Sequence, residues 1–223
     1  EPILKMASWP PGGFSSPEGM GLSDAKNSTW ITGNLSLYFD WFYHELTDEE
    51  RRIILHSIRW RLEHNVRHYS WKKDSLRGIG VFSSSHAYED FLWTLPGALA
   101  TYEHLPESRE AIELGLHYLM GVTNPFGSEE AWNEGMAYGG WKLATLLDTA
   151  LYFHFTVPAL HIERNPYWKK IGDFFSWLSP LGITSCSFGN QGHSMHYIRA
   201  HNANFRKLAF LTGDGCLLQN WKQ

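Results

Sequence analysis

Apolar residues recur at helical spacing along most of the chain, and short polar or glycine-rich turns separate the periodic segments. The segment 46–69 contains Thr47-Asp-Glu-Glu50 near its start, which is typical of a capping box. In a capping box the Thr hydroxyl accepts the backbone N–H of the Glu, and the Glu carboxylate accepts the backbone N–H of the Thr. No segment shows the alternation of a convincing strand, so the sequence predicts an all-α protein. The other helices that we expect cover residues 23–46, 85–104 with a break near Pro96-Gly97, 107–121, 129–156, 165–180 and 195–212.

The order of these helices predicts their architecture. Aromatic, apolar helices (23–46, 85–104 and 129–156) alternate with more charged ones (46–69 and 107–121), which indicates an inner and an outer layer. Antiparallel pairs with short connections build bundles, solenoids or closed toroids, and the alternation fits an α/α toroid best. We expect an irregular arm over residues 1–21 and an incomplete toroid over residues 22–223, as a piece of a longer chain.

Composition excludes several classes of function. The net charge is −4 and the charges are scattered, so no nucleic-acid face is expected. No apolar run approaches 18 residues, so no membrane segment is expected. The 11 Trp residues exceed the needs of an ordinary core and also suit a cleft that stacks on sugar rings. A disulfide between Cys186 and Cys216 cannot be deduced from their spacing.

The stretch "SSSHAYEDFLW" (83–93) places His86 and Glu89 three residues apart. Residues with this spacing share a face of a helix, and these two lie at the N-terminal end of the expected helix 85–104. A histidine beside a carboxylic acid can donate hydrogen bonds to an acidic substrate. The alternative, a capping histidine and an ordinary surface acid, stays open.

The stretch "SEEAWNEGMAYGGW" (128–141) opens the next apolar helix. Tyr138 follows Glu134 by one helical turn, and glycines stand at 135, 139 and 140. Glycine lowers helix stability by up to about 1 kcal/mol relative to Ala. Such a cost is explained either by a ligand that approaches the backbone or by close packing of helices.

Together these two stretches carry a family resemblance. "NEGMAYGGW" resembles the Glu-Gly-x-x-Tyr segment of the heparinase II/III-like polysaccharide lyases, and "SHAYED", about fifty residues upstream, resembles their His-x-x-Glu helix. "LTDEERRIIL" (46–55) and the later "SFGN" (187–190) also lie where that family has similar segments. The resemblance covers most of the chain, and its specificity comes from the order and spacing of the motifs.

The resemblance implies an enzyme that cleaves uronate-containing polysaccharides, such as glycosaminoglycans or alginate, by β-elimination. It implies an α/α toroid followed by β-sandwich domains, and a secreted or periplasmic protein. In this family's chemistry Tyr138 would give a proton to the leaving oxygen, and a second role in taking the C5 proton stays open. His86 would hold the substrate carboxylate, and Glu89 would offset the charge of the enolate. The remaining expected sugar contacts are Asn27, Trp132, Asn133, Glu134, Trp141 and His193.

The family commonly has a further catalytic histidine beyond the last residue of this chain, and His193 is only its nearest candidate here. No cofactor is expected, although a structural divalent metal elsewhere in a longer chain stays open. Two weaker metal hypotheses are the pair His64 and His68, four apart on a helix, and a set in the last forty residues. That set consists of Cys186, His193, His196 and His201.

Two rival functions remain. A glycoside hydrolase on the same toroid would use Glu134 as acid and Glu89 or Asp90 as base. A non-catalytic carbohydrate-binding module would bind the polymer without cutting it. Detection of the unsaturated uronate by its ultraviolet absorbance separates a lyase from both.

Overall fold

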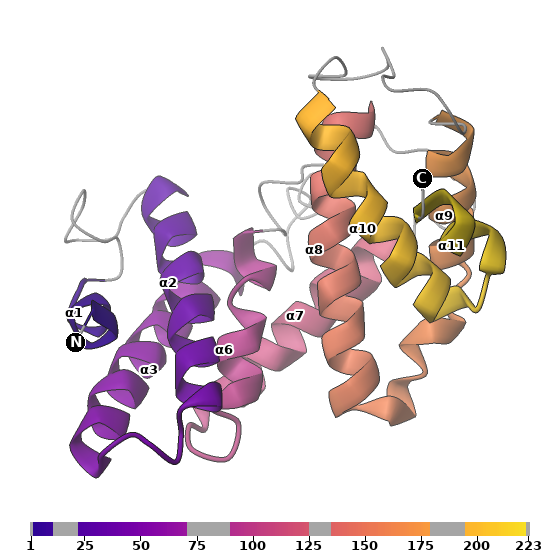
Figure 1. Ribbon diagram of the computed structural model, residues 1–223. Coiled ribbons are helices and arrows are strands. Elements are labelled where there is room, and N and C mark those ends of the chain that lie inside the picture. Colours follow the sequence, from indigo (N-terminus) through magenta and orange to yellow (C-terminus); the bar gives the residue numbers. More distant parts are fainter. Residues whose placement is uncertain (1, 11–21, 71–89, 125–134, 179–194, 222–223) are drawn as a thin grey trace. The chain divides into compact units, whose positions relative to one another are not determined.

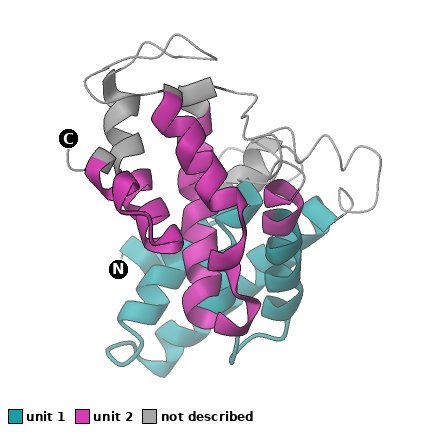
Figure 2. Cartoon of the chain, turned by 90° about the vertical axis from the view of Figure 1, so that its right-hand side faces the viewer, with its two compact units in different colours: residues 1–118 teal, residues 119–223 magenta. Residues whose placement is uncertain are grey.

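The computed structural model describes residues 2–10, 22–70, 90–124, 135–178 and 195–221, and these residues form helices, turns and loops without a strand. They divide into two compact units, unit 1 over residues 1–118 and unit 2 over residues 119–223 (Figure 2). The boundary falls within the helix α7 (Glu107–Thr123). The all-α prediction is therefore confirmed for the described residues.

Unit 1 contains α1 (Pro2–Ala7), α2 (Leu22–Trp41), α3 (Asp48–Ser70) and α6 (Leu95–Ala100), followed by most of α7 (Figure 1). Helix α2 packs against both α3 and α6, and α1 packs against α2 and α3. A Cβ added to Gly97 would lie 2.5 Å from the Cγ2 of Thr32, so this glycine allows α6 to approach α2 closely. The side chains that form its core include Leu35, Phe39, Ile54, Ile58, Leu62, Phe91, Leu95 and Leu114.

The capping box that the sequence predicts at the start of α3 is confirmed. The backbone N–H of Thr47 donates to Oε2 of Glu50 at 2.9 Å, and the N–H of Glu50 donates to the Thr47 hydroxyl at 3.3 Å. These bonds satisfy two backbone donors that the first turn of a helix leaves open. Helix α3 therefore begins one residue after Thr47, close to the expected position.

Unit 2 contains α8 (Gly135–Thr156), α9 (Tyr167–Leu178), α10 (Met195–Thr212) and α11 (Gly215–Trp221). Helix α10 packs against α8, α9 and α11 (Figure 1). Two short 3₁₀ helices, η2 (Pro158–Leu160) and η3 (Ile162–Arg164), connect α8 to α9. Its core is aliphatic and aromatic, and includes Leu143, Leu146, Leu147, Phe153, Trp168, Ile171, Phe175 and Leu208.

Three local expectations need correction. Residues 2–7, expected to belong to an irregular arm, form α1, and the C-terminal helix α11 was not expected. The helix expected over 85–104 is helical at residues 90–92, turns at Trp93 and Thr94, and resumes as α6. Because proline is favoured at the first helical positions, Pro96 lies in the first turn of the second piece, which begins at Leu95.

Within the described residues, no single helix is long and apolar enough to cross a membrane, while residues 139–156 and 158–177 meet that criterion only as a pair bent by 112°.

Candidate functional site

The residues that sequence analysis selects fall into three groups. Tyr138 and Asn27 lie in described helices, α8 and α2, although the structure does not describe their side chains. Trp141 is fully described. The others lie outside the described residues: His86, Glu89, Trp132, Asn133, Glu134 and His193.

Tyr138 lies in the first turn of α8, which begins at Gly135. The N-terminal end of a helix carries a partial positive charge, which favours an anion such as a phenolate or a substrate carboxylate. The two glycines that follow, Gly139 and Gly140, are buried. The start of α8 is therefore a suitable place for a negatively charged group.

A side chain of α10 holds this end of α8 in place. Asn204 is 3% exposed, and its Nδ2 donates a hydrogen bond of 2.7 Å to the carbonyl oxygen of Gly140. A buried bond of this kind contributes about 1 kcal/mol and fixes the register of the two helices. Of the two explanations for the glycine-rich start of α8, the contact at Gly140 supports close helix packing.

A line of polar residues runs along one face of α8 and begins at Tyr138. Lys142, Thr145 and Thr149 follow it at steps of four, three and four residues, which keeps the four positions on one side of a helix. Lys142 and Thr149 are each 1% exposed, and Thr145 is 8% exposed. We call these four positions the α8 polar stripe. Sequence reasoning missed Lys142, although a lysine inside "GGWKLATLL" was a visible signal.

Beside this stripe, α8 presents aromatic side chains to solvent. Trp141 follows Tyr138 by three residues and is 52% exposed, and Phe155 at the far end of the helix is 68% exposed. An exposed indole offers a flat apolar face of the kind that stacks on sugars. The exposure of Trp141 agrees with a role in polymer binding, which stays a prediction.

A glycoside hydrolase was one alternative function, with Asp90 as a candidate general base. The Asp90 side chain is only 6% exposed. It lies at the start of the helical turn 90–92 in unit 1, where burial and then the charge of Asp90 raise the pKa of Tyr69 far above its ordinary value. A base that activates water on a sugar must meet solvent and substrate. The position of Asp90 therefore does not favour that role.

The metal hypotheses gain no support from the described residues, which contain no group of three or more His, Cys, Asp or Glu able to hold a metal ion. The rings of His64 and His68 stack along α3 with centroids 6.4 Å apart. Cys216 is exposed in α11, and Cys186 lies outside the described residues. His196 and His201 belong to α10, where their side chains are not described.

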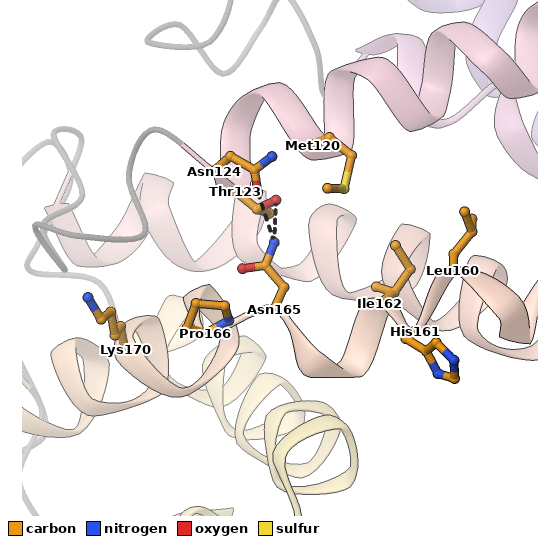
Figure 3. A pocket seen from close by; sticks show the side chains of 9 residues that line it. All are labelled: Met120, Thr123, Asn124, Leu160, His161, Ile162, Asn165, Pro166 and Lys170. Carbon is orange, nitrogen blue, oxygen red and sulfur yellow. Dashed lines mark hydrogen bonds between the residues drawn. The ribbon is translucent and has the colours of Figure 1, made fainter.

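Unit 2 also has a hollow of about 400 Å³ that sequence reasoning missed (Figure 3). Its polar wall is Asn165, whose Nδ2 donates to the Thr123 hydroxyl at 3.0 Å and to Oδ1 of Asn124 at 3.3 Å. Oδ1 of Asn165 accepts the backbone N–H of Tyr167 at 3.0 Å. Because these contacts already engage both ends of the amide, Asn165 caps α9 and holds it to the end of α7. The sequence signal was Asn165-Pro166 before a helix.

Next to this hollow, Glu163 connects two histidines. Its carboxylate lies 3.1 Å from Nδ1 of His154 and 3.4 Å from Nδ1 of His161. His161 has φ of 48°, the left-handed region that non-glycine residues rarely adopt. The hydrogen bond from its own backbone N–H, followed by the two histidine contacts, lowers the pKa of Glu163 below its ordinary value. The cluster joins the end of α8 to η3.

Comparison of the chain with models of protein families, with curated proteins and with solved structures finds no match.

Proposed function

We propose that this chain is the α-helical catalytic part of a polysaccharide lyase that cleaves uronate-containing polymers by β-elimination. The observation that carries the proposal is the Glu-Gly-x-x-Tyr segment at the start of α8. There Tyr138 lies in the first helical turn and heads the α8 polar stripe, and the half-exposed Trp141 stands beside it. The N-terminal end of α8 carries a partial positive charge. Buried polar side chains and an exposed indole lie within two turns of that end.

The proposed reaction assigns each group a task. A base removes the C5 proton of the uronate, the electron pair forms the C4=C5 double bond, and the bond from C4 to the glycosidic oxygen breaks. Tyr138 gives its proton to that oxygen and is the base as well. His86 holds the uronate carboxylate, and Glu89 offsets the charge that develops on it, which is commonly the largest contribution in such chemistry.

The rest of the proposal concerns architecture and context. The helix pairs belong to an α/α toroid, and the β-sandwich domains that the family resemblance implies follow in a longer chain. Sugar units along the polymer contact Trp141 and the other residues expected to bind substrate, which are Asn27, Trp132, Asn133, Glu134 and His193. The substrate is an acidic polysaccharide, the reaction needs no cofactor, and the protein acts outside the cytoplasm.

The proposal is tested on an active form of the protein with a panel of acidic polysaccharides, read by the ultraviolet absorbance of the unsaturated uronate. Tyr138→Phe keeps the ring and removes only the hydroxyl. We expect it to fold, to retain polymer binding and to lose at least about 10²-fold in turnover, the low end for a positioned acid or base. The matched control is Tyr152→Phe, a change near the other end of α8 that should leave turnover unaltered.

A carbohydrate-binding module is the second candidate, because Trp side chains are widely exposed. Trp30, Trp41, Trp60, Trp141 and Trp177 each present between 42% and 85% of their surface to solvent. Retention of polymer without any unsaturated or reducing-end product would favour that module. Reducing ends without ultraviolet absorbance would favour the hydrolase. A near wild-type elimination rate in Tyr138→Phe would remove Tyr138 from the mechanism.

A further inference from the structure

The hollow of unit 2 has two chemically different ends (Figure 3). Lys170 of α9 lies at one end of it. Toward the other end lie three apolar side chains, those of Met120, Leu160 and Ile162. All the residues that line the hollow belong to unit 2. Its volume of about 400 Å³ lies within the range of sites that hold small organic molecules. The hollow is therefore large enough for a ligand that has one polar and one apolar end.

The polar wall of the hollow retains donors and not acceptors. The Thr123 hydroxyl donates to the carbonyl oxygen of Leu119 at 2.9 Å and accepts from Nδ2 of Asn165. Oδ1 of Asn124 also accepts from Asn165, whose own Oδ1 is engaged at the start of α9. Among the described side chains of this wall, Nδ2 of Asn124 and the ammonium group of Lys170 remain to meet a ligand, and both groups only donate. A ligand at this end must therefore supply hydrogen-bond acceptors.

The charge of Lys170 indicates that these acceptors belong to an anion. Lys170 is partly buried, and it forms no ion pair with any Asp or Glu that the structure describes. The neighbouring Lys169 does have a partner, since its Nζ lies 3.8 Å from Oδ2 of Asp214 in α11. Glu163 of η3, next to the apolar end, already meets two histidines. A carboxylate is therefore attracted to the Lys170 end and repelled from the other, which fixes the direction of a bound ligand.

The apolar end of the hollow suits a hydrocarbon chain. Met120 projects from α7 toward η3, and Ile162 projects from η3 toward α7 (Figure 3). Ile162 is 6% exposed, whereas Leu160 is 39% exposed, so apolar area remains for a ligand to cover. Removing such area from water favours binding roughly in proportion to the area covered. This end therefore favours hydrocarbon over a hydroxylated group, which would lose hydrogen bonds to water there.

We propose that this hollow is a binding site for a small organic carboxylate with an unbranched apolar chain. The carboxylate accepts from the ammonium group of Lys170 and from Nδ2 of Asn124, and the chain lies over Met120, Ile162 and Leu160. The site goes beyond the proposed function, because it uses neither the start of α8 nor a polymer. It also selects against a free uronate, which has the same charge on a hydroxylated ring.

The first test compares probes that differ in one property each. Binding of hexanoate, acetate, hexanol and glucuronate to the full chain is measured by NMR titration. We expect saturable binding of hexanoate, weaker by at least about tenfold for hexanol, which lacks the charge. Acetate and glucuronate should each bind at least about tenfold more weakly than hexanoate, because neither offers an apolar chain. Absence of saturable hexanoate binding, or equal affinity for hexanoate and any of the other three probes, would overturn the proposal.

The second test locates the charge. Lys170→Met keeps an unbranched stem and should weaken hexanoate binding by at least about tenfold, while Lys170→Arg should keep the affinity close to that of the wild-type protein. The matched control is Lys169→Met, which removes the adjacent positive charge, on a side chain that is 68% exposed. Circular dichroism checks that each variant is folded. Unchanged binding in Lys170→Met, or an equal loss in Lys169→Met, would show that Lys170 does not hold the carboxylate.

The third test locates the apolar chain. Leu160→Ser removes part of the apolar end at a side chain that is 39% exposed, so the fold should tolerate the change. Hexanoate binding should weaken by at least about threefold, whereas acetate binding should stay as it is. Equal effects on the two probes, or no effect on hexanoate, would show that the chain does not lie at this end. None of these measurements uses polymer cleavage, so their outcome is independent of the lyase assay.

Discussion

Among the residues that the structure describes, each unit fully buries one Lys or Arg side chain, and the surroundings of the two side chains differ. Arg61 of unit 1 is 0% exposed and Lys142 of unit 2 is 1% exposed. Arg61 donates to the Ser57 hydroxyl and carbonyl and to the carbonyl oxygens of Trp9 and Pro10. Those partners are neutral, and burial lowers the pKa of Arg61 to about 10. Arg61 is therefore an anchor for the backbone of the N-terminal residues, whereas Lys142 lies in line with the candidate catalytic tyrosine.

The remaining buried polar groups extend this contrast. In unit 1 two such bonds connect helices: Nδ2 of Asn65 donates to the Thr94 hydroxyl at 3.1 Å, and the Tyr118 hydroxyl donates to the Tyr69 carbonyl at 3.0 Å. In unit 2 the core is mainly apolar, and much of its buried polarity follows the α8 polar stripe. Buried polar cross-links hold helices together in both units, since Asn204 also joins α10 to α8 in unit 2. The α8 polar stripe differs in that its buried polar residues follow one face of a single helix.

The largest effect is expected from removing the anchor in unit 1. Arg61→Ala deletes a fully buried side chain and leaves several carbonyl groups without their donor. Cavity formation and lost hydrogen bonds should together lower the free energy of unfolding by about 3 kcal/mol. Urea denaturation measures this loss, and limited proteolysis should cut more rapidly within residues 1–10.

The matched control for that change is Arg52→Ala on the same helix. Arg52 forms an exposed ion pair with Glu49, and both side chains are more than 60% exposed. Such exposed pairs contribute little to stability because solvent screens them. If Arg61→Ala and Arg52→Ala destabilise the protein equally, Arg61 does not anchor the N-terminal residues. The structural role that distinguishes Arg61 from Lys142 would then be wrong.

The main helices were predictable because capping residues and apolar spacing, which determine where they form, lie within the helical segments themselves. The capping box at Thr47 and the apolar spacing after it locate α3, and the same spacing locates α10 at the expected residues. The short helix α1 was missed because six residues cannot form a stable helix alone. It packs against α3, and the bond from Arg61 to the Trp9 carbonyl follows directly after it. That contact joins residues 52 positions apart, beyond the range of any local pattern.

The candidate site was predictable only as a pattern of residue types. The order of His86, Glu89 and Tyr138 indicated the chemistry, yet spacing alone does not bring the two stretches together in space. The burial of Lys142 depends on which side of α8 faces the core, and the apolar residues around it do not fix that. Trp30 and Trp41 are exposed on α2, although α2 was expected to be an inner helix. Their exposure depends on which helices pack around α2, and local sequence does not determine that.

An intermediate effect is expected at a single cross-link of unit 1. Thr94→Val keeps the shape of the side chain but removes the hydroxyl that accepts from Asn65. The buried amide then loses its acceptor, which should cost about 1–2 kcal/mol of unfolding free energy. The control is Thr156→Val in unit 2, where the exposed hydroxyl bonds only to the Tyr152 carbonyl of its own helix. Equal losses in the two variants would show that the bond from Asn65 to Thr94 does not stabilise unit 1 as a buried cross-link.

The smallest effect is expected at the surface of unit 2, where Glu163 contacts His154 and His161 and its side chain is 28% exposed. Arg164 also lies near it, with Nε 3.8 Å from Oε1. The pKa of Glu163 is lowered first by its own backbone N–H and then by the histidines. A carboxylate with a lowered pKa stabilises the fold above the ordinary value of about 4.3. That contribution is lost as pH falls through the lowered pKa.

Thermal unfolding between about pH 6 and pH 3 tests this sign, because ordinary glutamates titrate within that range. The Tm of the wild-type protein should fall more steeply with decreasing pH than that of Glu163→Gln, and the two curves should converge at the acidic end. Added salt should reduce the difference, because exposed charges are screened. Glu103→Gln, a change at another exposed glutamate, is the control and should follow the wild-type curve. If the Tm of Glu163→Gln also follows the wild-type curve, the contacts of Glu163 with His154 and His161 do not hold η3 to α8. The charge of Glu163 would then contribute nothing to the stability of unit 2.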